Sequence, residues 1–344
     1  MGSELKGGKY DQALLELRQP IDGQKFVPQL LLNDEILSQI VKDVRSILYV
    51  YIVSSSDSTG GDASEYIASI YQRLWDEMIS FNKLQLQCVV MGDAQSQGFR
   101  TRSEMHAEPN LDAILTFDDN VMENVNKGRA SLQLPAVEHI VKTKSIDHLL
   151  PGLHGRDMFF YENRDGNITL PSFENVALGG TFDRLHNGHR KLLTLAAGSC
   201  TKRLIIGITG DVLLAKKKAK DQIESFHTRK SEVVNFLRSI KPMLEFDAVE
   251  IQDAFGPTIS DPSIEAIVVS SETVMGAHAI NVRRREKGFA PIATLVMRRS
   301  ESATLSSTFI RERERDSTPV LMRVRRGFSR GWMRVSSALS YLWK

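Results

Sequence analysis

The sequence predicts an α/β protein built from parallel sheets and divided into two domains. Short apolar runs alternate with segments in which apolar residues recur at helical spacing, a pattern typical of successive strand and helix units. The length of 344 residues suits two domains, and residues 151–175 are dense in turn formers without a sustained period. We therefore expect an amino-terminal α/β domain over residues 1–150, a linker over 151–175 and a second domain over 176–316.

The amino-terminal domain contains three predicted strands and one predicted helix. The run Ile47–Val53 is apolar and rich in β-branched residues, which favours a buried strand. Apolar positions from Tyr66 to Ile79 recur at helical spacing, which predicts an amphipathic helix. Further strands are expected at Leu86–Met91 and Ala113–Phe117. This half carries no chemical signature, so the sequence leaves its role open.

The second domain continues the same alternation of strands and helices. No internal repeat is evident between the two halves of the sequence. The predicted strands are Val176–Leu178, Leu204–Thr209, Ala248–Ile251 and Ile264–Val269, and the predicted helices are Gly188–Ala197 and residues 223–240.

The composition is that of an ordinary globular protein, with 42% hydrophobic and 25% charged residues. Cys88 and Cys200 lie far apart and outside any CxxC pattern, so a disulfide framework and a thiolate zinc site are both excluded. No stretch approaches the ~18 apolar residues of a membrane span, and the first residues lack the apolar region of a signal peptide. We expect a cytoplasmic protein.

The formal net charge of +2 hides an uneven distribution. Residues 317–344 carry six basic side chains and no acid, so residues 1–316 have a net charge of −4. A nucleic-acid partner is therefore not expected for the body of the protein. Apolar residues of the tail recur at spacings of three and four, which predicts a basic amphipathic helix. Its alternatives are packing on the body or on another subunit of an oligomer, or peripheral contact with an anionic membrane.

The most informative segment follows a short apolar strand and runs into a predicted helix. Gly188 and His189 lie at the start of that helix, where unpaired backbone N–H groups and the helix dipole favour a phosphate. His186 and His189 add imidazole donors on either side of a glycine that permits close approach. The segment therefore predicts a site that handles a phosphoryl group. It reads Gly179-Gly180-Thr181-Phe182-Asp183-Arg184-Leu185-His186-Asn187-Gly188-His189.

This segment resembles the signature of the HxGH nucleotidylyltransferases, and most closely that of phosphopantetheine adenylyltransferases of the eukaryotic type. The resemblance extends to the adenylyltransferase domain of bifunctional coenzyme A synthase. It implies a Rossmann-like parallel-sheet nucleotidylyltransferase domain that transfers the adenylyl group of ATP to 4′-phosphopantetheine, giving dephospho-coenzyme A and pyrophosphate. No G-x-x-x-x-G-K-[ST] motif occurs, so dephospho-coenzyme A kinase activity is not expected in this chain.

A second block, Leu305-Ser306-Ser307-Thr308-Phe309-Ile310-Arg311-Glu312, resembles the closing motif of that family. Successive Ser and Thr residues at a helix start cap the helix and leave N–H groups for an anion. The resemblance implies that Ser306, Ser307, Thr308 and Arg311 hold the nucleotide phosphates.

Basic residues elsewhere complete the expected site. Lys216, Lys217 and Lys218 follow a predicted strand, and the family places a substrate-contacting lysine in this loop. Lys216 is preferred among the three. Arg284 lies in a segment that resembles the family's Val-Val-Ser-Glu-Glu-Thr block and its Asn-x-x-Arg continuation, and we expect it to contact the triphosphate. The chain departs from that block at Ser271, where a second acid is commoner.

The mechanism that the resemblance implies is an in-line attack by the phosphate of the acceptor on the α-phosphorus of ATP. Because the nucleophile is already anionic, catalysis requires positioning and charge stabilisation rather than a general base. We expect His189 at the α-phosphate, His186 at the phosphate channel and Thr181 at the attacking phosphate. Gly180, Phe182 and Gly188 form the phosphate-binding turn, and Mg²⁺ accompanies the triphosphate without a dedicated protein site.

Two alternative functions stay open. One is a cytidylyltransferase that acts on a phosphorylated alcohol, although its usual Arg-Thr-x-Gly-Ile-Ser-Thr motif is missing. The other is a degenerate nucleotide-binding protein with a regulatory role. Because every motif lies beyond the linker, we also expect residues 170–344 to fold and react without the first 150.

Overall fold

A computed structural model describes most of the chain. It covers residues 8–18, 34–53, 60–92, 98–116, 121–142, 161–162, 168–169, 172–215, 217, 220–270, 272–297 and 306–311. Residues 1–305 form one compact unit and residues 306–344 a second one, so residues 306–311 are described by themselves. Within the first unit, we call residues 8–142 the amino-terminal half and residues 172–297 the carboxyl-terminal half.

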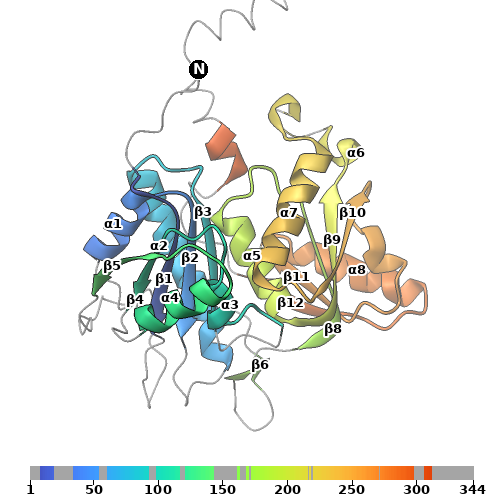
Figure 1. The fold of residues 1–344 in the computed structure, drawn as a ribbon. Coiled ribbons are helices and arrows are strands. Elements are labelled where there is room, and N and C mark those ends of the chain that lie inside the picture. Colours follow the sequence, from blue (N-terminus) through green and yellow to red (C-terminus); the bar gives the residue numbers. More distant parts are fainter. Residues whose placement is uncertain are drawn as a thin grey trace, which may run out of the picture. The chain divides into compact units, whose positions relative to one another are not determined.

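The amino-terminal half is built on a five-stranded parallel sheet (Figure 1). Its elements are β1 (Tyr10–Arg18), α1 (Asp34–Asp43), β2 (Val44–Val53), α2 (Gly60–Ser80), β3 (Gln87–Gly92), α3 (Arg102–His106), β4 (Ala113–Thr116), α4 (Val121–Ser131) and β5 (Glu138–Lys142). The strand order is β3-β2-β1-β4-β5, and every neighbouring pair is parallel.

The carboxyl-terminal half contains a second five-stranded parallel sheet, in the order β10-β9-β8-β11-β12. A short antiparallel pair, β6 (Tyr161–Glu162) and β7 (Ile168–Thr169), lies between the halves in sequence. The remaining elements are β8 (Phe173–Gly180), α5 (Asn187–Gly198), β9 (Cys200–Thr209), α6 (Asp211–Leu214), α7 (Phe226–Ile240), β10 (Glu245–Ile251), β11 (Ala266–Ser270), α8 (Val274–Glu286) and β12 (Ala293–Met297), with short 3₁₀ turns at Lys220–Gln222 and Gly256–Ile259.

These sheets confirm the predicted fold class, and the predicted strands and helices correspond to elements of the structure. The strand β1 was not predicted, although it lies at the centre of its sheet. Its sequence carries Asp11, Gln12 and Glu16 among the apolar residues, which obscures the pattern of a buried strand. Glu16 is nevertheless buried, and its carboxylate accepts hydrogen bonds from Arg102 and His106 of α3 and from Thr116 of β4.

The two halves repeat one design that the sequence does not reveal. Both have the same strand order with the switch at the first strand, and both have a register shift near the start of that strand. An acidic residue before the fourth strand accepts two backbone N–H bonds from the first strand in each half: Asp112 from residues 11 and 12, and Glu265 from residues 174 and 175. The equivalence lies in the strand order and in a few contacts between side chains and backbone, so most of the sequence of the two halves need not be similar.

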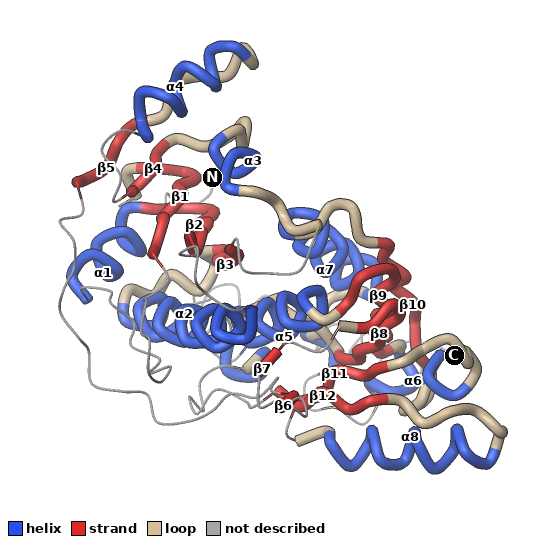
Figure 2. The backbone as a smooth tube through the Cα atoms, turned by 90° about the horizontal axis from the view of Figure 1, so that it is seen from below, coloured by secondary structure: helices blue, strands red, loops and turns tan. Residues whose placement is uncertain are grey.

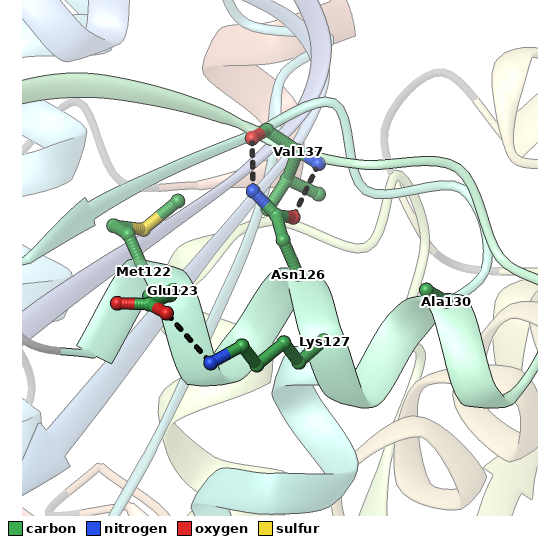
Figure 3. A pocket seen from close by; sticks show the side chains of 6 residues that line it. All are labelled: Met122, Glu123, Asn126, Lys127, Ala130 and Val137. Atoms are coloured by element: carbon green, nitrogen blue, oxygen red, sulfur yellow. Dashed lines mark hydrogen bonds and ion pairs between the residues drawn. The ribbon is translucent and has the colours of Figure 1, made fainter.

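The fourth helix of each half carries the same Asn-x-x-Arg pattern with the same hydrogen bonds, and we call this arrangement the latch. In α4, the Asn126 amide pairs with both backbone groups of Val137, at 3.3 and 3.0 Å (Figure 3). In α8, Asn281 pairs in the same way with Ile292, at 3.0 and 2.8 Å. The arginine three residues later donates from Nε to the carbonyl six residues beyond it in both halves, at 2.7 Å. Each latch fixes the connection from a helix to the last strand of its sheet.

The halves are in direct contact through α2 and α5, which lie side by side (Figure 2). One apolar cluster includes buried residues of both sheets, among them Tyr51 and Val89 from the first and Leu178 and Leu204 from the second. The Arg100 backbone N–H donates to the carbonyl that ends α7 at 2.9 Å. The amino-terminal half is therefore packed against the carboxyl-terminal half rather than merely tethered to it.

Candidate active site

The candidate site begins where β8 ends and α5 starts. Phe182 and Arg184, in the intervening turn, have φ values of 52° and 48°, the left-handed conformation that L-residues seldom adopt. The Phe182 ring is fully buried under Gly180, where an added Cβ would lie 3.0 Å from the ring. Gly180 is thus required by the close approach of this ring, and the strained turn carries the chain from the sheet to the helix.

The two histidines stack on each other at the start of α5. Their ring centroids are 3.9 Å apart with an interplanar angle of 23°. His186 is the N-cap residue, and its Nδ1 accepts the Gly188 backbone N–H at 3.2 Å. Burial, followed by the nearby charge of Arg190, lowers the pKa of His189 to about 3, so this imidazole is neutral at physiological pH. The Nδ1 atom of His189 is buried without a hydrogen-bond partner among the described residues.

Thr181 lies at the centre of a second set of contacts. Its hydroxyl accepts hydrogen bonds from Lys217 Nζ at 2.5 Å and from Thr209 Oγ1 at 3.2 Å. Its backbone carbonyl accepts from Arg229 Nη1 at 2.8 Å. The predicted residues Thr181 and Lys217 are therefore brought together at the carboxyl ends of β8 and β9, where parallel α/β sheets form their ligand crevice. Lys216 and Lys218 lie outside the described residues.

Sequence reasoning missed three residues that fix this arrangement. Arg229 of α7 is fully buried and donates to the carbonyls of Thr181, Thr209 and Glu224. Asp183 is also buried, and it accepts the Glu224 backbone N–H at 2.9 Å. The Glu224 carboxylate in turn accepts the Arg184 backbone N–H at 2.8 Å. Asp183 stands inside the motif and could have been identified, whereas Arg229 and Glu224 carry no local signal.

The structure gives Arg284 other partners than the triphosphate that the sequence analysis expected. Arg284 is fully buried, and each of its five N–H groups donates to a backbone carbonyl. The acceptors are the carbonyls of Ala290, Thr258, Asp261, Pro262 and Ile264, at 2.6–3.2 Å. Arg129 occupies the same position in the half without the HxGH motif. The Asn-x-x-Arg pattern is therefore a structural latch, and Arg284 has no donor left for a ligand.

The closing motif begins as a capped helical turn. The Ser306 hydroxyl accepts the Phe309 backbone N–H at 3.2 Å, and the Ser306 carbonyl accepts that of Ile310. Arg311 Nη2 donates to the Thr308 hydroxyl at 3.1 Å. The cap expected from the serine pattern is present, and the role of Ser306, Ser307, Thr308 and Arg311 in phosphate binding stays a prediction. Residues 317–344, including the predicted tail helix, lie outside the described residues.

Other features of the described chain do not add to this site. No group of three His, Cys, Asp or Glu side chains within the described ranges could hold a metal ion. None of the described helices is long and apolar enough to cross a membrane. A hollow of about 490 Å³ lies along α4, between Met122 and Val137 (Figure 3), on the half without the histidine motif.

Comparisons with known proteins match the part of the chain that contains this site. Residues 177–313 match the family model described as cytidylyltransferase-like. A phosphopantetheine adenylyltransferase of Saccharomyces cerevisiae is 43% identical over 174 residues, which cover 48% of this chain and 55% of the yeast protein. Proteins of the same name from Pyrobaculum aerophilum and Methanopyrus kandleri are 41% and 38% identical, over 40% and 37% of this chain and 90% and 80% of their own lengths.

These matches differ in how much of each relative they include. The chain spans about half the length of the yeast protein in the alignment, whereas the match with the Pyrobaculum protein covers 90% of that protein and 40% of this chain. The matched region contains the HxGH turn, the Thr181 contacts and the capped turn at Ser306. On the identity and coverage of the archaeal relatives, the chain belongs to the phosphopantetheine adenylyltransferase family.

Proposed function

We propose that this protein transfers the adenylyl group of ATP to 4′-phosphopantetheine, yielding dephospho-coenzyme A and pyrophosphate in coenzyme A biosynthesis. The observation that carries the proposal is the convergence of His186, His189, Thr181 and Lys217 at the start of α5 and the ends of β8 and β9. Family membership supplies the substrate pair.

The acceptor phosphate would bind beside Thr181. Lys217 Nζ and the Thr181 hydroxyl form a small cluster of donors, and Arg229 fixes the Thr181 backbone through a hydrogen bond to its carbonyl. A phosphate at this point would replace the contact between Lys217 and Thr181 with two charge-assisted bonds. The attacking oxygen would then be oriented by Thr181 and Lys217, which come from two segments far apart in the sequence.

The histidines would stabilise the charge that develops on the α-phosphate. His189 is neutral in the free site, and the negative charge of a bound triphosphate would raise its pKa and favour protonation. Its buried Nδ1 and the N–H groups that open α5 are donors suited to a pentavalent phosphorus. Mg²⁺ would be held chiefly by the phosphates of ATP, with solvent completing its shell. We place this reaction in the cytoplasm, which the two buried free thiols support.

A pyrophosphate-release assay with purified protein tests the proposal. ATP with 4′-phosphopantetheine and Mg²⁺ should release pyrophosphate, and omission of any one of the three should abolish the release. CTP replaces ATP in a parallel arm, because the matched family model is described as cytidylyltransferase-like. Faster release with CTP and a phosphorylated alcohol would favour the cytidylyltransferase alternative, and binding without release would favour a regulatory role.

A further inference from the structure

The face of α2 that packs against α5 connects the amino-terminal half to the candidate site. Tyr71, Trp75 and Met78 lie at helical spacings of four and three, so they form one stripe. Each is at most 1% exposed. All three reach residues of α5 or its cap, and the contacts fall within the HxGH motif and one to two turns after it.

The contacts of this stripe hold the start and the second half of the catalytic helix. The Tyr71 hydroxyl lies 3.2 Å from Thr194 Oγ1, in the second half of α5. At its start, the Asn187 amide donates to the Tyr71 carbonyl at 3.4 Å and lies 3.5 Å from the Met78 sulfur. Tyr71 is itself fixed to its own half, because its hydroxyl accepts the Val90 backbone N–H of β3 at 3.1 Å.

Trp75, on the same face of α2, lies next to His186 of the candidate site. Its ring centroid lies 6.1 Å from that of His186, at an interplanar angle of 50°. His186 stacks on His189, and His189 meets Phe182 at 5.4 Å. Four rings thus form a row from the amino-terminal half into the active site. Trp75 and Phe182, at the two ends, are fully buried, so the histidines are confined between two rings that have no freedom to move into solvent.

The row of rings also bears on which nitrogen of His186 carries the proton. Because Nδ1 accepts the Gly188 N–H, this atom carries no proton in the neutral ring, and the proton lies on Nε2. If the ring flipped, the hydrogen bond from the Gly188 N–H to Nδ1 would be lost, and the Nε2–H donor would point in another direction. The His186 ring has the His189 ring stacked at 3.9 Å and the buried Trp75 ring at 6.1 Å, so this packing favours the orientation that presents an Nε2–H donor.

We propose that the amino-terminal half is a positioning element for the HxGH histidines, and that Trp75 is the positioning residue through which it acts on His186. This inference rests on the proposed function for its kinetic readout. It assigns the half without a chemical signature a role in turnover rather than in substrate binding, because Trp75 packs near the ring of His186 and the described contacts of its helix are with protein elements.

The kinetic test compares Trp75→Leu with Trp75→Phe in the full chain. Trp75→Leu should lower kcat by about tenfold or more, since small displacements of a positioned group carry large rate losses, and it should leave both KM values within about twofold of wild type. Trp75→Phe keeps a ring against His186 and should restore most of kcat. Leu37→Ala, a buried change in α1 of the same half, is the matched control for lost stability and should retain wild-type kcat. Equal losses in Trp75→Leu and Leu37→Ala, or wild-type kcat in Trp75→Leu, would overturn the proposal.

Nuclear magnetic resonance of ¹⁵N-histidine-labelled protein gives a second readout that needs no turnover. His186, assigned by its absence in His186→Gln, should show the Nε2–H tautomer in the wild type and a mixed tautomer in Trp75→Leu. A wild-type His186 that carries its proton on Nδ1 refutes the proposal even if Trp75→Leu does not fold. If wild-type protein releases no pyrophosphate, the proposed function fails, and the tautomer measurement still decides whether the ring row orients His186.

Discussion

Replacing Arg284 with lysine separates a structural latch from a phosphate contact. Arg284 donates five hydrogen bonds from three nitrogens, whereas lysine has three donors on one nitrogen. At least two buried carbonyls therefore lose their partner. At about 1.5–3 kcal/mol for each hydrogen bond to a charged group, Arg284→Lys should lower the free energy of unfolding by about 3–6 kcal/mol. That is a large share of the roughly 5–15 kcal/mol that stabilises a typical domain.

Arg129 offers a matched control within the same chain. It makes three hydrogen bonds to the carbonyls of Pro135, His106 and Glu108, and its Nη2 has no partner among the described residues. A lysine can replace more of these bonds, so Arg129→Lys should cost less than Arg284→Lys. Urea unfolding at 25 °C measures both values. The KM for ATP of folded Arg284→Lys should stay within about twofold of wild type, because the residue has no free donor for a phosphate. A stable variant with a tenfold higher KM would refute the latch and restore the triphosphate contact.

Four further predictions concern the site, the amino-terminal half and the ends of the chain. His189→Ala should keep its circular dichroism spectrum and lose about 10²- to 10³-fold in turnover, the usual effect of removing one preorganised donor; a folded variant with wild-type turnover would exclude the assigned role. Burial alone would raise the pKa of Glu16, but hydrogen bonds from Arg102, His106 and Thr116 outweigh it and lower the pKa to about 2. Its contribution, roughly 3 kcal/mol, is therefore fully present above the unfolded pKa of about 4.3 and lost as pH falls through 2; between pH 6 and pH 2, the free energy of unfolding in urea should fall by about 3 kcal/mol more in the wild type than in Glu16→Gln. The fragment of residues 170–344 should fold and react, with about tenfold lower kcat if Trp75 positions His186; an insoluble fragment would show that the halves depend on each other for folding. The full-length chain should stay in the supernatant with anionic liposomes at low salt if the tail packs on protein, whereas sedimentation that is lost on deletion of residues 317–344 would place the tail on membranes.

The order of strands and helices and the phosphate-handling turn could both be predicted from the sequence. Apolar runs such as Ile47–Val53 are local signals, because burial on both faces of a parallel sheet requires them. The Gly-Gly-Thr-Phe-Asp turn and the two histidines are also local, since a helix start, a glycine and a capping side chain are all set by neighbours in sequence. The predicted fold class and the family followed from these short-range features.

Only the tertiary structure decided which charged side chains have their donors occupied by backbone carbonyls and which lie at the crevice beside Thr181. Arg284 and Lys217 look alike in a sequence, because a cation near a motif carries no mark of whether its donors point at backbone carbonyls or at a crevice. The central strand β1 escaped prediction because Glu16 is satisfied by α3 and β4, about 100 residues away. The duplication and the contact between Trp75 and His186 are likewise relations between distant segments, and hydrogen-bond partners across a sheet or between two helices exist only after the chain has folded.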